Sequence, residues 1–277
     1  IMNQLTIYDE YLTDISKSNS FSNRAFLYGE SLFTTIRISH SKPLFLEEHL
    51  ERITASLEFL YRTKIPKNIR KNILKICEKF IHGKLRITFY QESNYEDLVD
   101  KDGIIQLVYF VKELEHDFLE NISNVKLCFA DARKTESLIP SFLKNGNYIL
   151  QSLEKENAQK NNYDDVLFLT HDGFITESST SNILLRKGDC FYTPASSSMV
   201  LDGITKKILC RGMIKENFKV KFESLKVEKL SKIDECWLLS SIVGIQNIAQ
   251  IENTSYNVDN NWTNKLIAIL KEEIENE

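Results

Sequence analysis

The segment 140–206 constrains the fold most, because it alternates short apolar runs with tight turns. An apolar strand is expected at 165–170, and the turn residues of 171–173 follow it. A second extended segment at 175–184 leads to an amphipathic helix that begins near Thr205. This part of the chain should therefore be a mixed domain of short strands and helices.

The rest of the second half repeats these elements. Strands are expected at 125–131, 166–169, 182–186, 219–223, 235–240 and 244–251. Helical spacing of apolar residues predicts helices at 147–161, 205–216 and 262–275.

The first half is also mixed. Alternation predicts a strand at Leu32–Ile38, with Phe33, Thr35 and Arg37 on one face. Further strands are expected at 84–90 and 104–111, and helices at 44–60 and 66–81. A polar run then interrupts the pattern, and we interpret 114–121 as a linker between domains at 1–113 and 122–277. The predicted fold class is α+β.

Bulk composition excludes several classes of protein. The chain has 277 residues and a net charge of −4, which gives no basic surface for nucleic acid. No apolar run is long enough for a membrane span, and no signal peptide is visible, so we expect a cytoplasmic location. The cysteines are odd in number and unpaired in spacing, which predicts free thiols and no structural zinc: Cys77, Cys128, Cys190, Cys210 and Cys236.

Two residues of the central segment could carry chemistry. Lys144 follows the apolar pair Phe142–Leu143, and a desolvated lysine is a better amine. Glu177 precedes a run of small polar residues and could face a pyridinium nitrogen. Taken alone, each has an ordinary explanation, namely a solvated surface charge for Lys144 and a turn residue for Glu177.

Other residues could bind an anion. Gly203, Ile204 and Thr205 open a helix whose first N–H groups could bind a phosphate, although Thr205 could simply be an N-cap. Ser240 and Ser241 end a strand and could add hydroxyls. Arg52 lies on the first long helix and could equally be a surface charge.

The order of these residues resembles the class IV aminotransferase family of pyridoxal-phosphate enzymes. The segment 23–37 is similar to the family's D-R-G-F-x-x-G-D-G-x-F-E-T-x-R block, and 46–52 is similar to its H-x-x-R-L helix. Lys144–Tyr148 matches K-x-x-N-Y, and 164–182 matches the block that ends in T-E-x-x-x-x-N. The resemblance implies fold type IV, with an N-terminal α/β two-layer sandwich and a C-terminal β-barrel-like domain with helices.

The resemblance also implies roles. Lys144 would bind the aldehyde of pyridoxal 5′-phosphate and move the substrate's α-proton, while Glu177 would face the ring nitrogen and Tyr148 the phenolic oxygen. The phosphate would be held by Arg52, Ile204, Thr205 and Ser241, with Ser240 beside them. Phe33, Thr35 and Arg37 would line the substrate side. The partners implied are a small-molecule amine and a second copy of the chain in a homodimer, with no metal.

The reaction is predicted from two residues. Thr34 and Thr35 stand where the branched-chain aminotransferases have Glu-Gly, which favours a lyase resembling 4-amino-4-deoxychorismate lyase. The chain also lacks the R-G-x-G loop that many family members carry after the position of Arg86. In those members the loop commonly helps to bind substrate carboxylates. Arg37, Arg86 and Arg133 are alternative carboxylate partners. The alternatives are an amino-acid transaminase, branched-chain or D-amino acid, and an inactive relative that acts as a binding protein.

Overall fold

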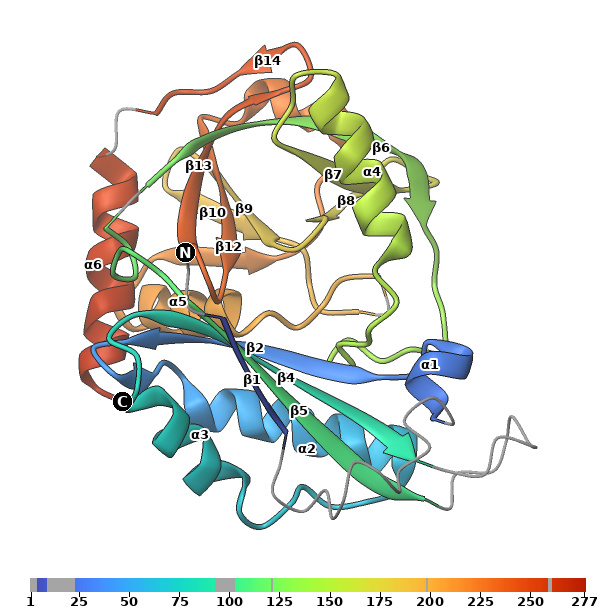
Figure 1. Ribbon diagram of the computed structural model, residues 1–277. Coiled ribbons are helices and arrows are strands. Elements are labelled where there is room, and N and C mark those ends of the chain that lie inside the picture. The colour runs from blue at the N-terminus through green and yellow to red at the C-terminus, as the bar shows by residue number, and fades with distance from the viewer. Residues whose placement is uncertain (1–3, 9–22, 93–102, 121, 198, 259–260) are drawn as a thin grey trace. The chain divides into compact units, whose positions relative to one another are not determined.

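The chain packs into two compact units that are discontinuous in sequence. The computed structural model describes residues 4–8, 23–92, 103–120, 122–197, 199–258 and 261–277 (Figure 1). Unit 1 comprises Ile1–Asp117 and Phe142–Tyr148, and unit 2 comprises Phe118–Ser141 and Ile149–Glu277. These units differ from the contiguous ranges 1–113 and 122–277 expected from the sequence, because the segment 142–148 groups with unit 1. The end of the expected linker, residue 121, lies outside the described residues.

Unit 1 contains one antiparallel sheet. Its strand order is β1-β5-β4-β2-β3, with the bounds β1 Gln4–Tyr8, β2 Leu32–Ser39, β3 Lys42–Pro43, β4 Gly83–Glu92 and β5 Ile104–Glu113. Along β4 the side chains alternate between buried and half-buried. This period of two means that one face of the sheet packs against the core and the other is partly open.

Two helices cover the core face of this sheet. They are α2 Leu46–Tyr61 and α3 Ile69–Cys77, while the short α1 spans Arg24–Tyr28. Buried apolar residues of α2, α3, β2, β4 and β5 form one cluster, which includes Ile36, Leu57, Ile73, Ile87 and Tyr109. The predicted two-layer α/β sandwich is confirmed.

Unit 2 contains a closed ring of six strands. The ring runs β9-β12-β13-β6-β7-β8 and returns to β9 through the Glu177–Asn182 pair. Its bounds are β6 Asn124–Lys134, β7 Asp165–Thr170, β8 Ile175–Ser178, β9 Asn182–Lys187, β12 Glu235–Ser240 and β13 Gly244–Ile251. The apolar side chains of these strands form their own cluster, which includes Leu127, Leu167, Ile183, Leu238 and Ile248. The predicted barrel-like domain is confirmed.

Further elements complete unit 2. They are β10 Cys190–Thr193, β11 Lys219–Phe222, β14 Thr254–Ser255, the 3₁₀ helix η1 Val227–Lys232, and the helices α4 Ile149–Lys160, α5 Ile204–Lys215 and α6 Asn261–Glu275. Gly212 lets α5 approach α6 closely, since a Cβ there would lie 2.5 Å from the Ile269 side chain. No helix among the described residues is long and apolar enough to cross a membrane.

One buried carboxylate joins α6 to α5. Glu273 is 5% exposed and accepts hydrogen bonds from Arg211 Nε at 2.8 Å and from Lys215 Nζ at 2.6 Å. Burial alone would raise the pKa of Glu273, but the hydrogen bonds from Lys215 and Arg211 outweigh it and lower that pKa below its usual value of 4.5. A lowered pKa means that the folded state binds the proton more weakly than the unfolded chain does. The contribution of Glu273 to the free energy of unfolding is therefore present above pH 4.5 and is lost as the pH falls below that value.

Glu273→Gln should therefore reduce the free energy of unfolding at neutral pH by roughly 1 kcal/mol, because both cationic partners are partly exposed. Urea denaturation at pH 7 and again in acid measures this difference, which should shrink in acid. Glu272→Gln is the matched control, since that residue is exposed on the same helix. If the free energy of unfolding differs between Glu273→Gln and the parent by the same amount at both pH values, the ion pair is not the cause of the difference.

Candidate active site

The backbone around Lys144 is attached to the start of β2. Phe33 N donates to Lys144 O at 2.9 Å, and Gly146 N donates to Ser31 O at the same distance. Leu32 and Asn145 form an isolated bridge between these hydrogen bonds. The segment 142–148 is thus a short extension of the unit 1 sheet, and this pairing explains why it belongs to unit 1.

The Lys144 ammonium lies against two aromatic rings. Lys144 Nζ donates to Tyr148 Oη at 2.6 Å and lies 4.8 Å from the centroid of the Phe33 ring. The Phe33 and Tyr148 rings meet edge to face at 5.3 Å. The Lys144 amine, the Tyr148 phenol and the Phe33 ring therefore lie together in unit 1, with the amine near both ring faces.

The partly open face of the unit 1 sheet carries several cations. Direct cross-strand pairs place Thr35 opposite Arg86 and Arg37 opposite Lys84, and Lys84 is opposite Lys112 of β5. The Arg86 guanidinium stacks on Phe33 at 3.6 Å from the ring centroid. Burial, together with the charges of Arg86 and Lys112, lowers the pKa of Lys84. Such a face attracts carboxylates.

The three arginines predicted to meet carboxylates lie in different surroundings. Arg86 shares the face of Phe33 and Thr35, and burial lowers the pKa of its guanidinium. Arg37 is buried and donates to the backbone oxygen of His116. Arg133 lies in unit 2 and donates to the carbonyl oxygens of Ala130 and Asp131. Arg86 is therefore the arginine placed beside the Lys144 group.

The other face of β2 holds a buried chain of polar groups. Arg52 donates to Thr34 Oγ1 at 3.2 Å, and that hydroxyl lies 2.6 Å from His49 Nδ1. Burial lowers the pKa of His49 far below its usual value, and the charges of Arg52 and Lys144 lower it further. The imidazole is therefore neutral, and the Thr34 hydroxyl, which accepts from Arg52, can donate to Nδ1. This chain fixes where the Arg52 guanidinium lies.

A second group of predicted residues lies in unit 2, around Glu177. Glu177 Oε1 accepts from Lys134 Nζ at 3.1 Å, and Oε2 accepts from the Leu201 N–H at 2.9 Å. Asn182, which pairs with Glu177 in the closing step of the ring, donates to Leu201 O at 3.0 Å. The carboxylate is half-buried and is held in place by the ion pair with Lys134 and the backbone hydrogen bond from Leu201.

The N-terminus of α5 lies beside this group in the same unit. Asn182 Oδ1 leaves no room for a side chain at residue 203, because a Cβ on Gly203 would lie 1.7 Å from it. None of the described side chains caps this helix end. Thr205 is 2% exposed, and its Oγ1 is buried with no hydrogen-bond partner among the described residues. Ile204 is also buried there.

The two serines follow at the end of β12. Ser240 Oγ accepts from Val243 N at 3.3 Å, and Ser241 is half-buried in the turn before β13. The structure thus places the predicted residues in two groups. Unit 1 holds Lys144, Tyr148, Arg52, Phe33, Thr35 and Arg37, and unit 2 holds Glu177, Ile204, Thr205, Ser240 and Ser241.

Sequence reasoning missed several residues of these groups. Lys134, Lys84 and Lys112 are charged residues of strands, and only strand pairing shows which face they share or which carboxylate they meet. Lys206 was also missed, although it directly follows Thr205. It is 2% exposed and donates to Ser196 Oγ at 2.9 Å, which ties the loop before α5 to the helix.

Comparisons with known proteins agree with this architecture. The family model for amino-transferase class IV matches residues 31–251. The chain is 26% identical over 270 residues to the aminodeoxychorismate lyase of Bacillus subtilis, covering 92% of this chain and 89% of that protein. It is 28% identical over 255 residues to a probable branched-chain-amino-acid aminotransferase of Rickettsia bellii, covering 89% and 86%.

A solved structure shows the shared fold. The 4-amino-4-deoxychorismate lyase from Pseudomonas aeruginosa superposes with a TM-score of 0.85 at 19% identity, covering 98% of this chain and all of that one. The matched range contains Lys144, Glu177, Thr205 and Ser241, and it spans well over half of the chain. The chain therefore belongs to the class IV aminotransferase family of enzymes.

Proposed function

We propose that the protein is a pyridoxal 5′-phosphate-dependent lyase that cleaves 4-amino-4-deoxychorismate to pyruvate and 4-aminobenzoate, a step of folate biosynthesis. Membership of the class IV family supports the cofactor, and the similarity to the Bacillus subtilis lyase supports the reaction. The observation that carries the substrate class is the cationic face beside Lys144, because this substrate bears two carboxylates.

The described residues fit the cofactor. Lys144 offers an amine within hydrogen-bond reach of the Tyr148 phenol. Glu177 offers a carboxylate whose Oε1 pairs with Lys134 Nζ at 3.1 Å. The Thr205 hydroxyl and the N-terminus of α5, which have no hydrogen-bonding or capping side chain among the described residues, offer donors to a phosphate, as helix N-termini commonly do. We propose that Arg52 and Ser241, with Ser240 beside it, add to the phosphate site.

Each residue then has one task. Bound pyridoxal phosphate supplies a ring that withdraws electrons from the carbon bearing the substrate's amino group. Glu177 keeps the ring nitrogen protonated. Lys144 Nζ takes the proton that this carbon loses, and Tyr148 Oη, at 2.6 Å, orients the amine for that transfer. Loss of pyruvate then makes the ring of the product aromatic, which drives the cleavage.

The substrate face favours the lyase. Thr35 lies on the face of Phe33 and directly opposite Arg86. A hydroxyl and a guanidinium at these positions suit a polar substrate with carboxylates better than they suit an aliphatic side chain. A transaminase is the second candidate, and the similarity to the Rickettsia bellii protein supports it.

One preparation tests both candidates. The cofactor-loaded protein is mixed with 4-amino-4-deoxychorismate, and 4-aminobenzoate and pyruvate are quantified. In parallel, the protein is mixed with a branched-chain L-amino acid or D-alanine without an acceptor, and the cofactor's absorbance is followed. We expect equimolar products and no rapid change of the cofactor. Rapid conversion of the bound cofactor to its amino form by an amino acid, with no 4-aminobenzoate formed from 4-amino-4-deoxychorismate, would show that the protein is a transaminase and not the lyase.

A protein that takes up no cofactor would support the third alternative, an inactive relative that binds partners. The proposal also includes a cytoplasmic location, a homodimer, a small-molecule amine as the ligand, and no role in nucleic-acid or membrane binding.

A further inference from the structure

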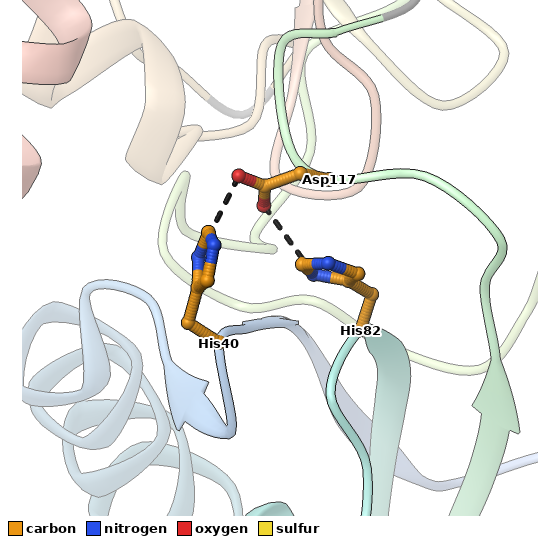
Figure 2. Close-up of side chains that lie close together, drawn as sticks. All are labelled: His40, His82 and Asp117. Carbon is orange, nitrogen blue, oxygen red and sulfur yellow. Dashed lines mark ion pairs between the residues drawn. The ribbon is translucent and has the colours of Figure 1, made fainter.

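Three potential metal ligands meet at one end of the unit 1 sheet, away from the Lys144 group. They are His40, His82 and Asp117, and Figure 2 shows the carboxylate of Asp117 between the two imidazoles. Phe33, which contacts Lys144, is seven residues before His40. The part of this stretch that lies within β2 rises about 3.3 Å per residue, so Phe33 and the end of β2 before His40 are roughly 20 Å apart. The cluster is thus separate from the residues proposed to bind cofactor and substrate.

Strand pairing fixes the three positions. His40 follows β2, His82 precedes β4 and Asp117 follows β5, and these are neighbouring antiparallel strands. Two backbone hydrogen bonds fasten the connecting loops, from Ser41 N to Ile81 O and from Leu114 N to His82 O, each 3.0 Å long. The ligands therefore project from a rigid end of the sheet.

The distances suit a tetrahedral ion. His82 Nδ1 is 3.4 Å from Asp117 Oδ1, and His40 Nδ1 is 3.6 Å from Asp117 Oδ2. The three ligand atoms all lie within 4.8 Å of one another. Two ligands bound at about 2.05 Å in tetrahedral geometry are about 3.3 Å apart, so small side-chain rotations close the site around an ion.

A second observation points to a ligand. His82 Nδ1 is buried, makes no hydrogen bond among the described residues, and has Asp117 Oδ1 as an ion-pair partner at 3.4 Å. That ion pair exists only while the imidazole is protonated, whereas a cation between the two atoms would bind the neutral imidazole and the carboxylate together. Ser39 Oγ donates to Asp117 Oδ1, the kind of contact that commonly orients a metal-binding carboxylate, and it also lies 3.1 Å from His40 Nδ1, which would exchange this hydrogen bond for the ion.

We propose that His40, His82 and Asp117 bind one Zn²⁺ ion. Two imidazoles and one carboxylate are a donor set that zinc accepts, and the fourth position would hold water. The His40 side chain is 73% exposed, so the ion can enter from solvent. The bound ion joins the ends of three strands and stabilises unit 1. Cysteine spacing could not predict this site, because its ligands are histidines and an aspartate far apart in sequence.

The test is zinc binding to the chelator-treated, full-length, cofactor-loaded protein, measured by competition with a chromophoric zinc chelator. We expect one equivalent to bind, and His40→Ala to weaken binding roughly 100-fold or more, since even the partners of metal ligands contribute 10- to 100-fold. His171→Ala is the matched control, because His171 is an exposed turn histidine of unit 2. It should bind zinc like the parent protein.

Asp117→Asn provides a second test that keeps the shape of the side chain. It should also weaken zinc binding, and zinc should raise the melting temperature of the parent but not of either variant. Circular dichroism checks that the variants are folded. Equal zinc affinity in the parent and the folded His40→Ala and Asp117→Asn proteins, or no stoichiometric binding by the parent, would overturn the proposal.

Discussion

Lys144→Ala should reduce product formation on the order of 10⁴-fold, the upper end of what a positioned general acid–base group contributes. The methyl group of alanine can neither bind the cofactor's aldehyde nor take the α-proton. The fold should persist, because the segment is attached to β2 through backbone groups, Lys144 O and Gly146 N, which the substitution retains. Rates of pyruvate and 4-aminobenzoate formation measure the effect, and circular dichroism checks the fold.

A matched control is Lys160→Ala, which removes an exposed lysine from α4 and should leave the rate unchanged. Borohydride reduction of the parent followed by peptide mass spectrometry should place the mass of the reduced cofactor on the peptide that contains Lys144. Turnover of Lys144→Ala at the parent rate, or cofactor attached to another lysine, would remove Lys144 from the proposed mechanism.

Glu177→Gln should lower the rate roughly 10²- to 10³-fold, the size of effect seen when one preorganised electrostatic group is removed from an active site. Glutamine keeps the shape and can still accept from the Leu201 N–H, but it cannot hold a proton on the ring nitrogen. The rate should therefore fall far more than cofactor affinity does. Steady-state kinetics and cofactor titration, compared on the same variant, measure the two effects.

The ion pair with Lys134 needs its own control, because Glu177→Gln also breaks it. Lys134→Met removes the pair but keeps the carboxylate, and we expect a smaller loss of rate. If Lys134→Met and Glu177→Gln lower the rate equally, the ion pair rather than the carboxylate at the ring would explain the result.

Local patterns predicted the elements of this protein well. The alternation at Leu32–Ile38 correctly placed Phe33, Thr35 and Arg37 on one face of a strand, because successive side chains of a strand point to opposite faces of the sheet. The helix expected at 66–81 is Ile69–Cys77 in the structure, since the first residues form a turn in which Ile69 N donates to Pro66 O. The strand Cys190–Thr193 was missed, although the equally short strand Lys219–Phe222, which pairs with it, was predicted.

Long-range pairing explains what the sequence could not predict. Nothing near Lys134 indicates that it meets Glu177, which lies 43 residues later. The cations Lys84 and Arg86 share a face with Phe33 only because β2 and β4 pair in one register. The family resemblance supplied Lys144, Glu177, Arg52 and Thr205 as site residues, and their roles stay predictions, of which the variants above test those of Lys144 and Glu177.

The return of residues 142–148 to unit 1 affects how this enzyme can be divided. A fragment that ends near Asp117 would retain β2 but lose the reactive amine, and the complementary fragment would carry that amine without the strand that aligns it. A split-gene design that divides the chain at 118–120 therefore places Lys144 and the strand that aligns it on different fragments. Two halves produced independently can regain activity only if residues 142–148 of one half pair again with the start of β2 in the other.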